Sequence, residues 1–300
     1  EQSFRGRDAR RLALVRELVA GTVIDAAEAE RVLDYRVDGE HVAIVAWSSG
    51  RTDTDDALAA TALELADLIG DGRALVVGDT LDAVTVWVKP SNGEMPSLDT
   101  VTESLRKREI QAAIGRTGQG LRGLSTTKRQ ADLARAVAEL HPERSITRYA
   151  DVALAAVLLR DHDAARAFAA DELGRLARDT KAAAVLRSTL AAFYADGQDQ
   201  SRTARELGLH RNTVANRLRR AEELLGHPVD QRVREIEAAL VIVDSLPTDR
   251  WRPSTARRPS ICEMMRGPSG GNWARHGKAS RLATSGAPGC RPAANFCASI

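Results

Sequence analysis

The stretch QSRTARELGLHRNTVANRLRRAEELLG (residues 200–226) has the pattern of two short helices that cross closely at a tight turn. Such a crossing needs a small residue midway along the first helix, a glycine in the turn, and a β-branched apolar residue where the second helix docks. Ala204, Gly208 and Val214 occupy these three positions, and a leucine lies on each side of the glycine. The stretch therefore predicts a helix-turn-helix.

The second of these helices has one apolar face and one basic face. Val214, Leu218, Ala221 and Leu225 recur at helical spacing and form the inward stripe. Residues 202–220 contain six arginines and one acidic residue. An arginine side chain can bind the edge of guanine and an asparagine side chain the edge of adenine, while the remaining basic side chains contact phosphates. An ordinary helical hairpin with a solvated basic face is the alternative interpretation. We expect the following residues to bind DNA: Arg202, His210, Arg211, Asn212, Thr213, Asn216, Arg217, Arg219 and Arg220.

A longer segment, residues 186–226, resembles the C-terminal helix-turn-helix of PucR/CdaR-type transcriptional regulators. The resemblance rests on these positions: Leu186, Thr189, Leu190, Tyr194, Ala204, Leu207, His210, Arg211, Asn212, Thr213, Val214, Arg217, Leu218, Glu223, Leu224, Leu225 and Gly226. The chain departs from the family where Ala215 and Asn216 replace a usual bulky residue, which leaves the base preference open. The resemblance implies a sequence-specific DNA-binding regulator.

The first half of the chain alternates between strand and helix patterns. Short β-branched runs at 41–47, 73–79 and 83–88 predict strands, and an amphipathic helix lies between the first two runs. Further helices are expected at 8–20, 25–33, 97–109 and 126–140, with a strand at 110–115 and an extended piece at 145–149. This order predicts an α/β fold of one sheet and several helices, and the resemblance given next implies that the sheet is mixed. The region also resembles the degenerate GGDEF-like domain of the same regulators.

Beyond Asp151 the strand patterns stop, and six helices are expected at 151–160, 163–178, 181–195, 200–208, 211–225 and 230–245. The fold class is therefore α/β followed by an all-α helix-turn-helix domain. We divide the chain into N-terminal linker helices (1–40), a GGDEF-like domain (41–150), connecting helices (151–180), the helix-turn-helix domain (181–246) and a tail (247–300).

The tail differs in composition from the rest of the chain. It contains all three cysteines, six of the ten prolines, and nine basic residues against two acidic ones. Such a segment cannot bury enough apolar surface to offset its ordering entropy, so we expect it to be disordered; a basic arm on DNA phosphates is the alternative. The chain has no apolar run that would act as a signal peptide or membrane span, which favours a cytoplasmic protein. It begins with Glu1, as expected of a fragment.

An enzyme built on the α/β half is the competing function. Gly118, Gly120 and Gly123 spell the GxGxxG pattern of dinucleotide sites, but the pattern does not open a βαβ unit and no terminal acid follows. The family resemblance implies that a cyclase needs a turn with two adjacent glycines and acidic residues. The chain has no such run of residues. The histidines lack metal-ligand spacing. We therefore expect no catalytic residues, metal or cofactor; the expected partners are a double-stranded operator, a second copy of the chain and a small-molecule effector.

Overall fold

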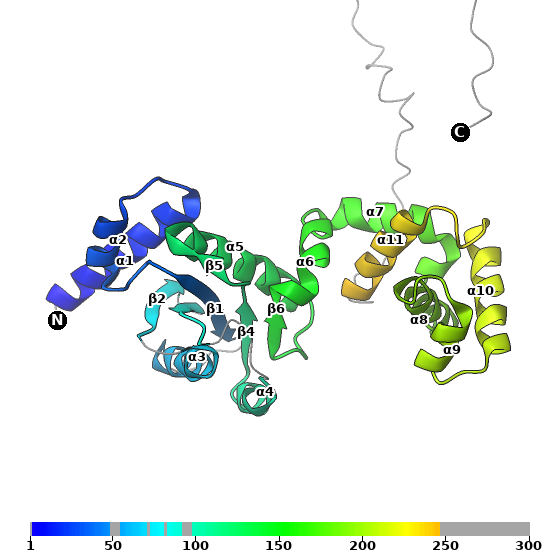
Figure 1. Ribbon diagram of the computed structural model, residues 1–300, viewed down its shortest axis with the longest axis horizontal. Coiled ribbons are helices and arrows are strands. Elements are labelled where there is room, and N and C mark those ends of the chain that lie inside the picture. Colours follow the sequence, from blue (N-terminus) through cyan, green and yellow to red (C-terminus); the bar gives the residue numbers. More distant parts are fainter. Residues whose placement is uncertain (1, 49–54, 71–72, 81–82, 92–97, 247–300) are drawn as a thin grey trace, which may run out of the picture. The chain divides into compact units, whose positions relative to one another are not determined.

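The computed structural model describes residues 2–48, 55–70, 73–80, 83–91 and 98–246 (Figure 1). The predicted disordered tail, its basic-arm alternative and the three cysteines all lie outside these ranges. Within them, no helix combines the length and the apolar character that crossing a membrane requires.

The first part of the described chain is a mixed α/β fold, as the sequence predicts. Its elements are α1 (Gln2–Ala20), α2 (Ala26–Leu33), β1 (Glu40–Ser48), α3 (Asp55–Ile69), β2 (Leu75–Thr80), β3 (Ala83–Val88), α4 (Asp99–Lys107), β4 (Ile110–Ile114), β5 (Gly118–Gln119), α5 (Gly120–Ala138) and β6 (Ile146–Arg148). The sheet order is β2-β3-β1-β4-β6, with β5 paired to β1. All pairings are antiparallel except that of β4 with β6.

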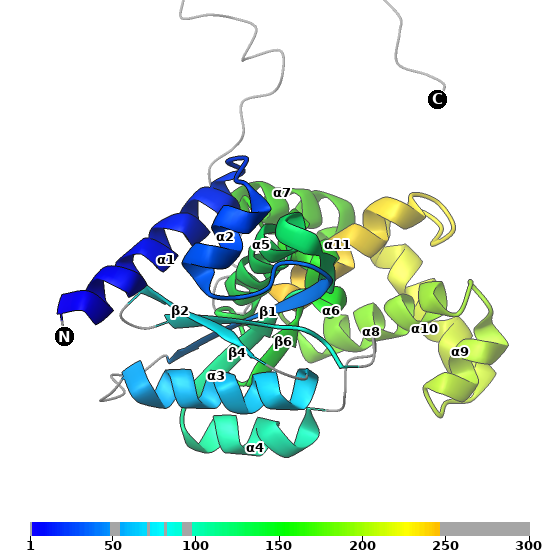
Figure 2. The ribbon, with the colours of Figure 1, turned by 60° about the vertical axis from the view of Figure 1, so that its left-hand side comes forward.

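Strand β1 is buried on both faces of the sheet. Ala43, Val45 and Trp47 belong to the apolar cluster that includes buried residues of α1, α2 and α5. The alternate residues Val42, Ile44 and Ala46 pack in a second cluster with α3 and Leu105 of α4. Figure 2 shows the resulting layers, with α1, α2 and α5 on one side of the sheet and α3 and α4 on the other. The uninterrupted apolar run in β1 therefore reflects burial from two sides.

Helix α5 begins at Gly120, six residues before the predicted start at 126. The sequence interpretation began the helix after three glycines that occur within six residues. In the structure, a Cβ built on Gly123 would lie 2.3 Å from the carbonyl carbon of Gly118, so the backbones of β5 and α5 touch. The outer glycines of the GxGxxG pattern therefore serve close packing of a strand against a helix.

The second part of the described chain is helical, as predicted. It contains α6 (Tyr149–Leu158), α7 (His162–Leu173), a 3₁₀ turn η1 (Gly174–Ala177), α8 (Lys181–Ala195), α9 (Gln200–Glu206), α10 (Arg211–Leu225) and α11 (Val233–Ser245). The helix predicted over 163–178 ends at Leu173 because Gly174 adopts a positive φ of 51°. Helix α11 packs against α7, and the Arg232 guanidinium donates to both carboxylate oxygens of Glu172 at 2.6 and 2.9 Å.

Candidate DNA-binding interface

Helix α8 provides the support on which the helix-turn-helix is built. Thr189 and Leu190 are fully buried, and Tyr194 is 7% exposed. The Tyr194 hydroxyl donates to the carbonyl of Val229, in the segment after α10, at 2.7 Å. Burial raises the pKa of this phenol, which therefore stays protonated as a donor. Helix α10 packs against both α8 and α9, so α8 holds the start and the end of the motif together.

The turn between α9 and α10 closes with two backbone hydrogen bonds that together form a Schellman motif. The Gly208 amide donates to the Arg205 carbonyl at 3.2 Å, and the Leu209 amide donates to the Ala204 carbonyl at 2.8 Å. Gly208 has a φ of 63°, in the left-handed region that favours glycine. Ala204 and Val214 are buried, as the crossing pattern predicts. The predicted turn is confirmed.

Side chains cap both helices of the motif at their N-termini. The Asp199 carboxylate accepts from the backbone amides of Ser201 at 2.7 Å and Arg202 at 3.1 Å. The His210 ring caps α10 by accepting from the Asn212 amide through Nδ1 at 3.2 Å. His210 therefore fixes the start of α10. Asp199 was not expected from the sequence, although an aspartate just before a helical stretch is a recognised cap signal.

The Asp199 cap predicts a pH dependence of stability. Its bonds to the Arg202 and Ser201 amides hold the carboxyl pKa below its ordinary value. A lowered folded-state pKa contributes stability above the unfolded value of about 3.9, and this contribution is lost as the pH falls through the folded value. We expect Asp199→Asn, which keeps a capping oxygen, to reduce the loss in melting temperature between pH 6 and pH 3. Identical pH profiles for the two proteins, followed by circular dichroism, would contradict this.

Most predicted DNA-binding residues lie on the solvent side of the motif. Seven are exposed, namely Arg202, His210, Arg211, Asn212, Asn216, Arg219 and Arg220. Thr213 is partly buried in the first turn of α10. Arg205, which the sequence interpretation left out of the site, is also exposed, at the end of α9. The positive charge of these arginines is therefore accessible to a polyanion such as DNA.

The polar side chains at the two ends of α10 differ in their hydrogen-bond and ion-pair partners. Arg219 donates to the Asn216 side-chain oxygen at 3.2 Å, and Arg220 forms an ion pair with Glu223. Arg211 and the Asn212 side chain have no hydrogen-bond or ion-pair partner among the described residues. The N-terminal turn of α10 therefore presents the side chains that are free to bind a ligand.

Arg217 lies differently from the other arginines of α10. It is only partly exposed, and its guanidinium donates to the Thr189 hydroxyl of α8 at 3.2 Å. Thr189 is itself fully buried and donates to the Val185 carbonyl at 2.8 Å. This contact connects α10 to its supporting helix. The structure thus places Arg217 where it can position α10, a role that spacing along one helix does not reveal.

Two protein families match two separate regions of the chain. The PucR C-terminal helix-turn-helix domain matches residues 186–242. The GGDEF-like domain matches residues 20–137. The first match runs from Leu186 within α8 through α9 and α10 to most of α11, and the second runs from the end of α1 to α5. Both resemblances stated from the sequence are confirmed.

Individual relatives match shorter parts of the chain. The transcriptional activator PmfR of Paenarthrobacter nicotinovorans is 40% identical over 73 residues, which are 24% of this chain and 16% of that protein. An uncharacterized protein in the pkwA 5' region of Thermomonospora curvata is 40% identical over 93 residues, 30% of this chain and 52% of that protein. The chain thus spans about one sixth and about half of these curated relatives.

A solved structure, that of a regulator of polyketide synthase expression from Bifidobacterium adolescentis, aligns with 78% of this chain and 92% of its own. Its sequence identity is 20% and its TM-score is 0.39.

Proposed function

We propose that this chain, a PucR-type regulator by its two matched domains, binds operator DNA through the helix-turn-helix of α9 and α10 and thereby controls transcription. The observation that carries the proposal is the exposed N-terminal turn of α10, where Arg211 and Asn212 have no partner among the described residues. In helix-turn-helix proteins this end of the second helix contacts base edges in the major groove.

The proposed contacts divide into two kinds. Arg211 and Asn212 would read bases, because a guanidinium can bind guanine bidentately and a carboxamide can bind adenine in the same way. Arg202, Arg219 and Arg220 would contact phosphates and fix the register on the duplex. His210 acts through its cap on α10. The experiment that tests the function is selection of bound fragments from random DNA: a single enriched motif supports it, and binding without enrichment contradicts it.

Arg217 and Arg220 should respond differently to alanine substitution. Arg220→Ala should weaken operator and random DNA alike and reduce the salt slope by about one unit, because it removes one phosphate contact. Arg217→Ala should disturb the seating of α10 through the lost bond to Thr189. We therefore expect Arg217→Ala and Thr189→Val to be non-additive in a double-mutant cycle of melting and operator affinity. Strict additivity would instead make Arg217 a direct DNA contact.

A homodimer is the assembly that this function favours. One helix-turn-helix covers few base pairs, and dimers that read two half-sites about 34 Å apart increase selectivity. Sedimentation equilibrium of the protein with and without operator tests the assembly. A selected motif with two-fold symmetry and a dimeric mass support it, and an asymmetric single half-site bound by a monomer contradicts it. A cytoplasmic location accords with the same role.

The α/β domain is proposed to relay a signal without catalysing a reaction. The GGDEF-like match extends over residues 20–137, which include α2 and the end of α1 as well as the sheet. Support comes from the outer glycines of the GxGxxG pattern, whose backbones pack against each other. Incubation of the full chain with GTP and ATP, followed by chromatography of the nucleotides, tests this: turnover above a no-protein control would restore the enzyme alternative.

A further inference from the structure

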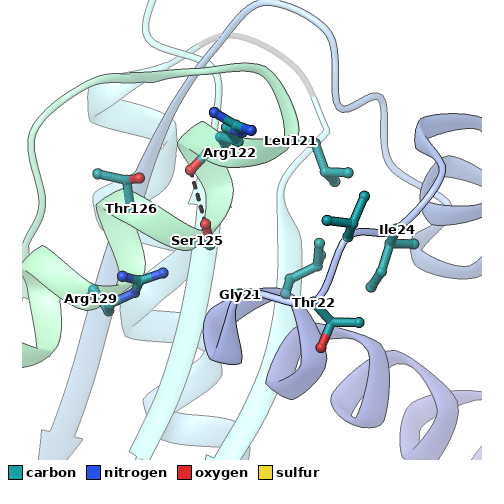
Figure 3. Close-up of a pocket in the computed structure, with 10 residues that line it drawn as sticks. Gly21, Thr22, Ile24, Leu121, Arg122, Ser125, Thr126 and Arg129 are labelled. Carbon is teal, nitrogen blue, oxygen red and sulfur yellow. Dashed lines mark hydrogen bonds between the residues drawn. The ribbon is translucent and has the colours of Figure 1, made fainter.

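A cavity of about 340 Å³ lies between the segment that joins α1 to α2 and the outer face of the first three turns of α5 (Figure 3). This volume falls within the range of small-molecule sites. Gly21 and Ile24 line one wall, and Leu121, Ser125 and Arg129 are among the residues of the other. The two walls come from parts of the chain about 100 residues apart in sequence.

The segment from Gly21 to Ile24 is held at both ends. At its start, the Gly21 amide donates to the Leu18 carbonyl at 3.1 Å and the Thr22 amide donates to the Glu17 carbonyl at 3.0 Å. These bonds form a Schellman motif, with Gly21 at a φ of 91°. At its end, Asp25 caps α2 by accepting from the Glu28 amide at 3.1 Å. A short segment fixed at both ends makes a preformed wall.

The walls combine apolar surface with positive charge. Leu18, Ile24 and Leu121 supply apolar area, and Val23 is 96% exposed at the rim. Arg122 and Arg129 line the cavity from α5, and no acidic residue is found among the described residues that line it. This composition favours an anion with an apolar body, because burying the body gains hydrophobic free energy while the guanidiniums bind the charge.

The charge of these two arginines is not neutralised within the described part of the chain. Other bases of α5 have carboxylate partners: Lys128 contacts Asp132 at 2.6 Å, and Arg135 contacts Glu139 at 2.8 Å. Arg122 and Arg129 have neither an ion-pair nor a side-chain hydrogen-bond partner among the described residues, and both are exposed. Their seven-residue separation places them two turns apart on the same side of α5.

In a second, larger cavity of about 710 Å³ around Asp34, by contrast, basic side chains are paired with carboxylates of the protein. Arg73 of its lining forms an ion pair with Asp34, and Lys89 contacts Asp38 at 2.9 Å. Its positive charge is therefore largely matched by carboxylates of the protein. An anionic ligand has more to gain in the cavity beside α5.

We propose that the cavity between Gly21–Ile24 and α5 binds a small organic carboxylate with a compact apolar body. Arg122 and Arg129 bind the carboxylate, and Leu18, Ile24 and Leu121 contact the body. The binding site stands on this geometry alone. Its role as the effector site rests on the proposed function, because it requires that ligand binding changes operator affinity.

Trp87 provides a reporter for binding. Its indole N–H donates to the Leu124 carbonyl at 3.0 Å, and Leu124 directly precedes Ser125 of the cavity wall. Trp87 is only 1% exposed, so ligands change its resonance through the wall rather than by contact. Comparison with Trp87→Phe assigns the resonance in nitrogen–proton correlation spectra of the full chain.

The test titrates the full chain with benzoate and hexanoate as carboxylate probes, benzamide as the neutral counterpart of benzoate, and inorganic phosphate as an anion without an apolar body. We expect a carboxylate Kd of about 1 mM or lower, with benzamide and phosphate at least tenfold weaker. Arg122→Ala and Arg129→Ala should each weaken benzoate at least tenfold. Arg16→Ala, which removes an equal charge from the exposed surface of α1 outside the cavity, should not.

Three results would overturn the site: no saturable binding of either carboxylate, equal binding of benzamide or phosphate, or unchanged benzoate affinity in both α5 variants. Because both arginines are exposed, the two variants should have the melting temperature of the wild type. If a variant were unfolded, its nitrogen–proton correlation spectrum would show this. Operator binding without ligand is measured separately, so failure of the proposed function stays distinguishable. A change in operator affinity with benzoate that Arg129→Ala abolishes supports the effector role, and its absence in the wild type overturns that role.

Discussion

Arg211→Ala and Asn212→Ala are each expected to lower operator affinity by roughly 5- to 150-fold while changing affinity for random DNA far less. Both side chains are exposed in the first turn of α10, directly after the His210 cap. A bidentate contact with a base edge contributes about 1–3 kcal/mol of discrimination, which corresponds to that range. The measurement is a competition assay with operator and scrambled duplexes at one fixed salt concentration.

Arg234→Ala is the matched control for Arg211→Ala. It removes the same charge from an exposed position on α11, outside the helix-turn-helix, and should leave the ratio of operator to random affinity unchanged. A ratio that stays at the wild-type value in both Arg211→Ala and Asn212→Ala would show that another surface reads the bases.

Gly208→Val is expected to destabilise the helix-turn-helix by about 2 kcal/mol, a large fraction of the stability of a small domain. The glycine has a φ of 63°, which a β-branched residue adopts only with strain. A Cβ at this position would meet no atom within 4 Å, so the cost comes from the backbone and not from a collision. Chemical denaturation followed by circular dichroism measures the loss.

The backbone origin of this effect can be separated from a packing effect by a second variant. Asn adopts the left-handed conformation more readily than other residues with a side chain, so Gly208→Asn should cost clearly less than Gly208→Val. Operator affinity should follow the same order. Equal destabilisation by Asn and Val would contradict the backbone explanation. It would mean that side-chain contacts at position 208 cause the loss of stability.

The helix-turn-helix was predictable because its requirements are local. A small residue, a turn glycine and a β-branched residue within eleven positions fix how two adjacent helices cross, and Ala204, Gly208 and Val214 are found there. The orientation of Arg217 was not predictable, because it depends on Thr189, which lies 28 residues earlier in the sequence. The sequence pattern of one helix shows which of its residues share a face. It does not show which other helix packs against that face.

The α/β domain shows the same division. Strand β1 was predicted from its β-branched run, whereas the start of α5 was predicted six residues late. Three glycines suggest a turn by intrinsic propensity, and only the contact between Gly118 and Gly123 explains why a helix forms there. The cavity beside α5 gave no sequence signal, because its two walls become neighbours only in the folded domain.

The position of β1 also bears on how this protein would aggregate. HVAIVAW (residues 41–47) is uncharged apart from its histidine, rich in β-branched residues and free of proline and glycine, the composition of segments that form intermolecular β-structure. In the folded sheet it pairs with β3 on one edge and β4 on the other, and helices cover both faces. The segment can reach another molecule only after the sheet opens. Variants that loosen β3 or β4 should therefore form insoluble assemblies faster than variants of equal instability in α9 and α10.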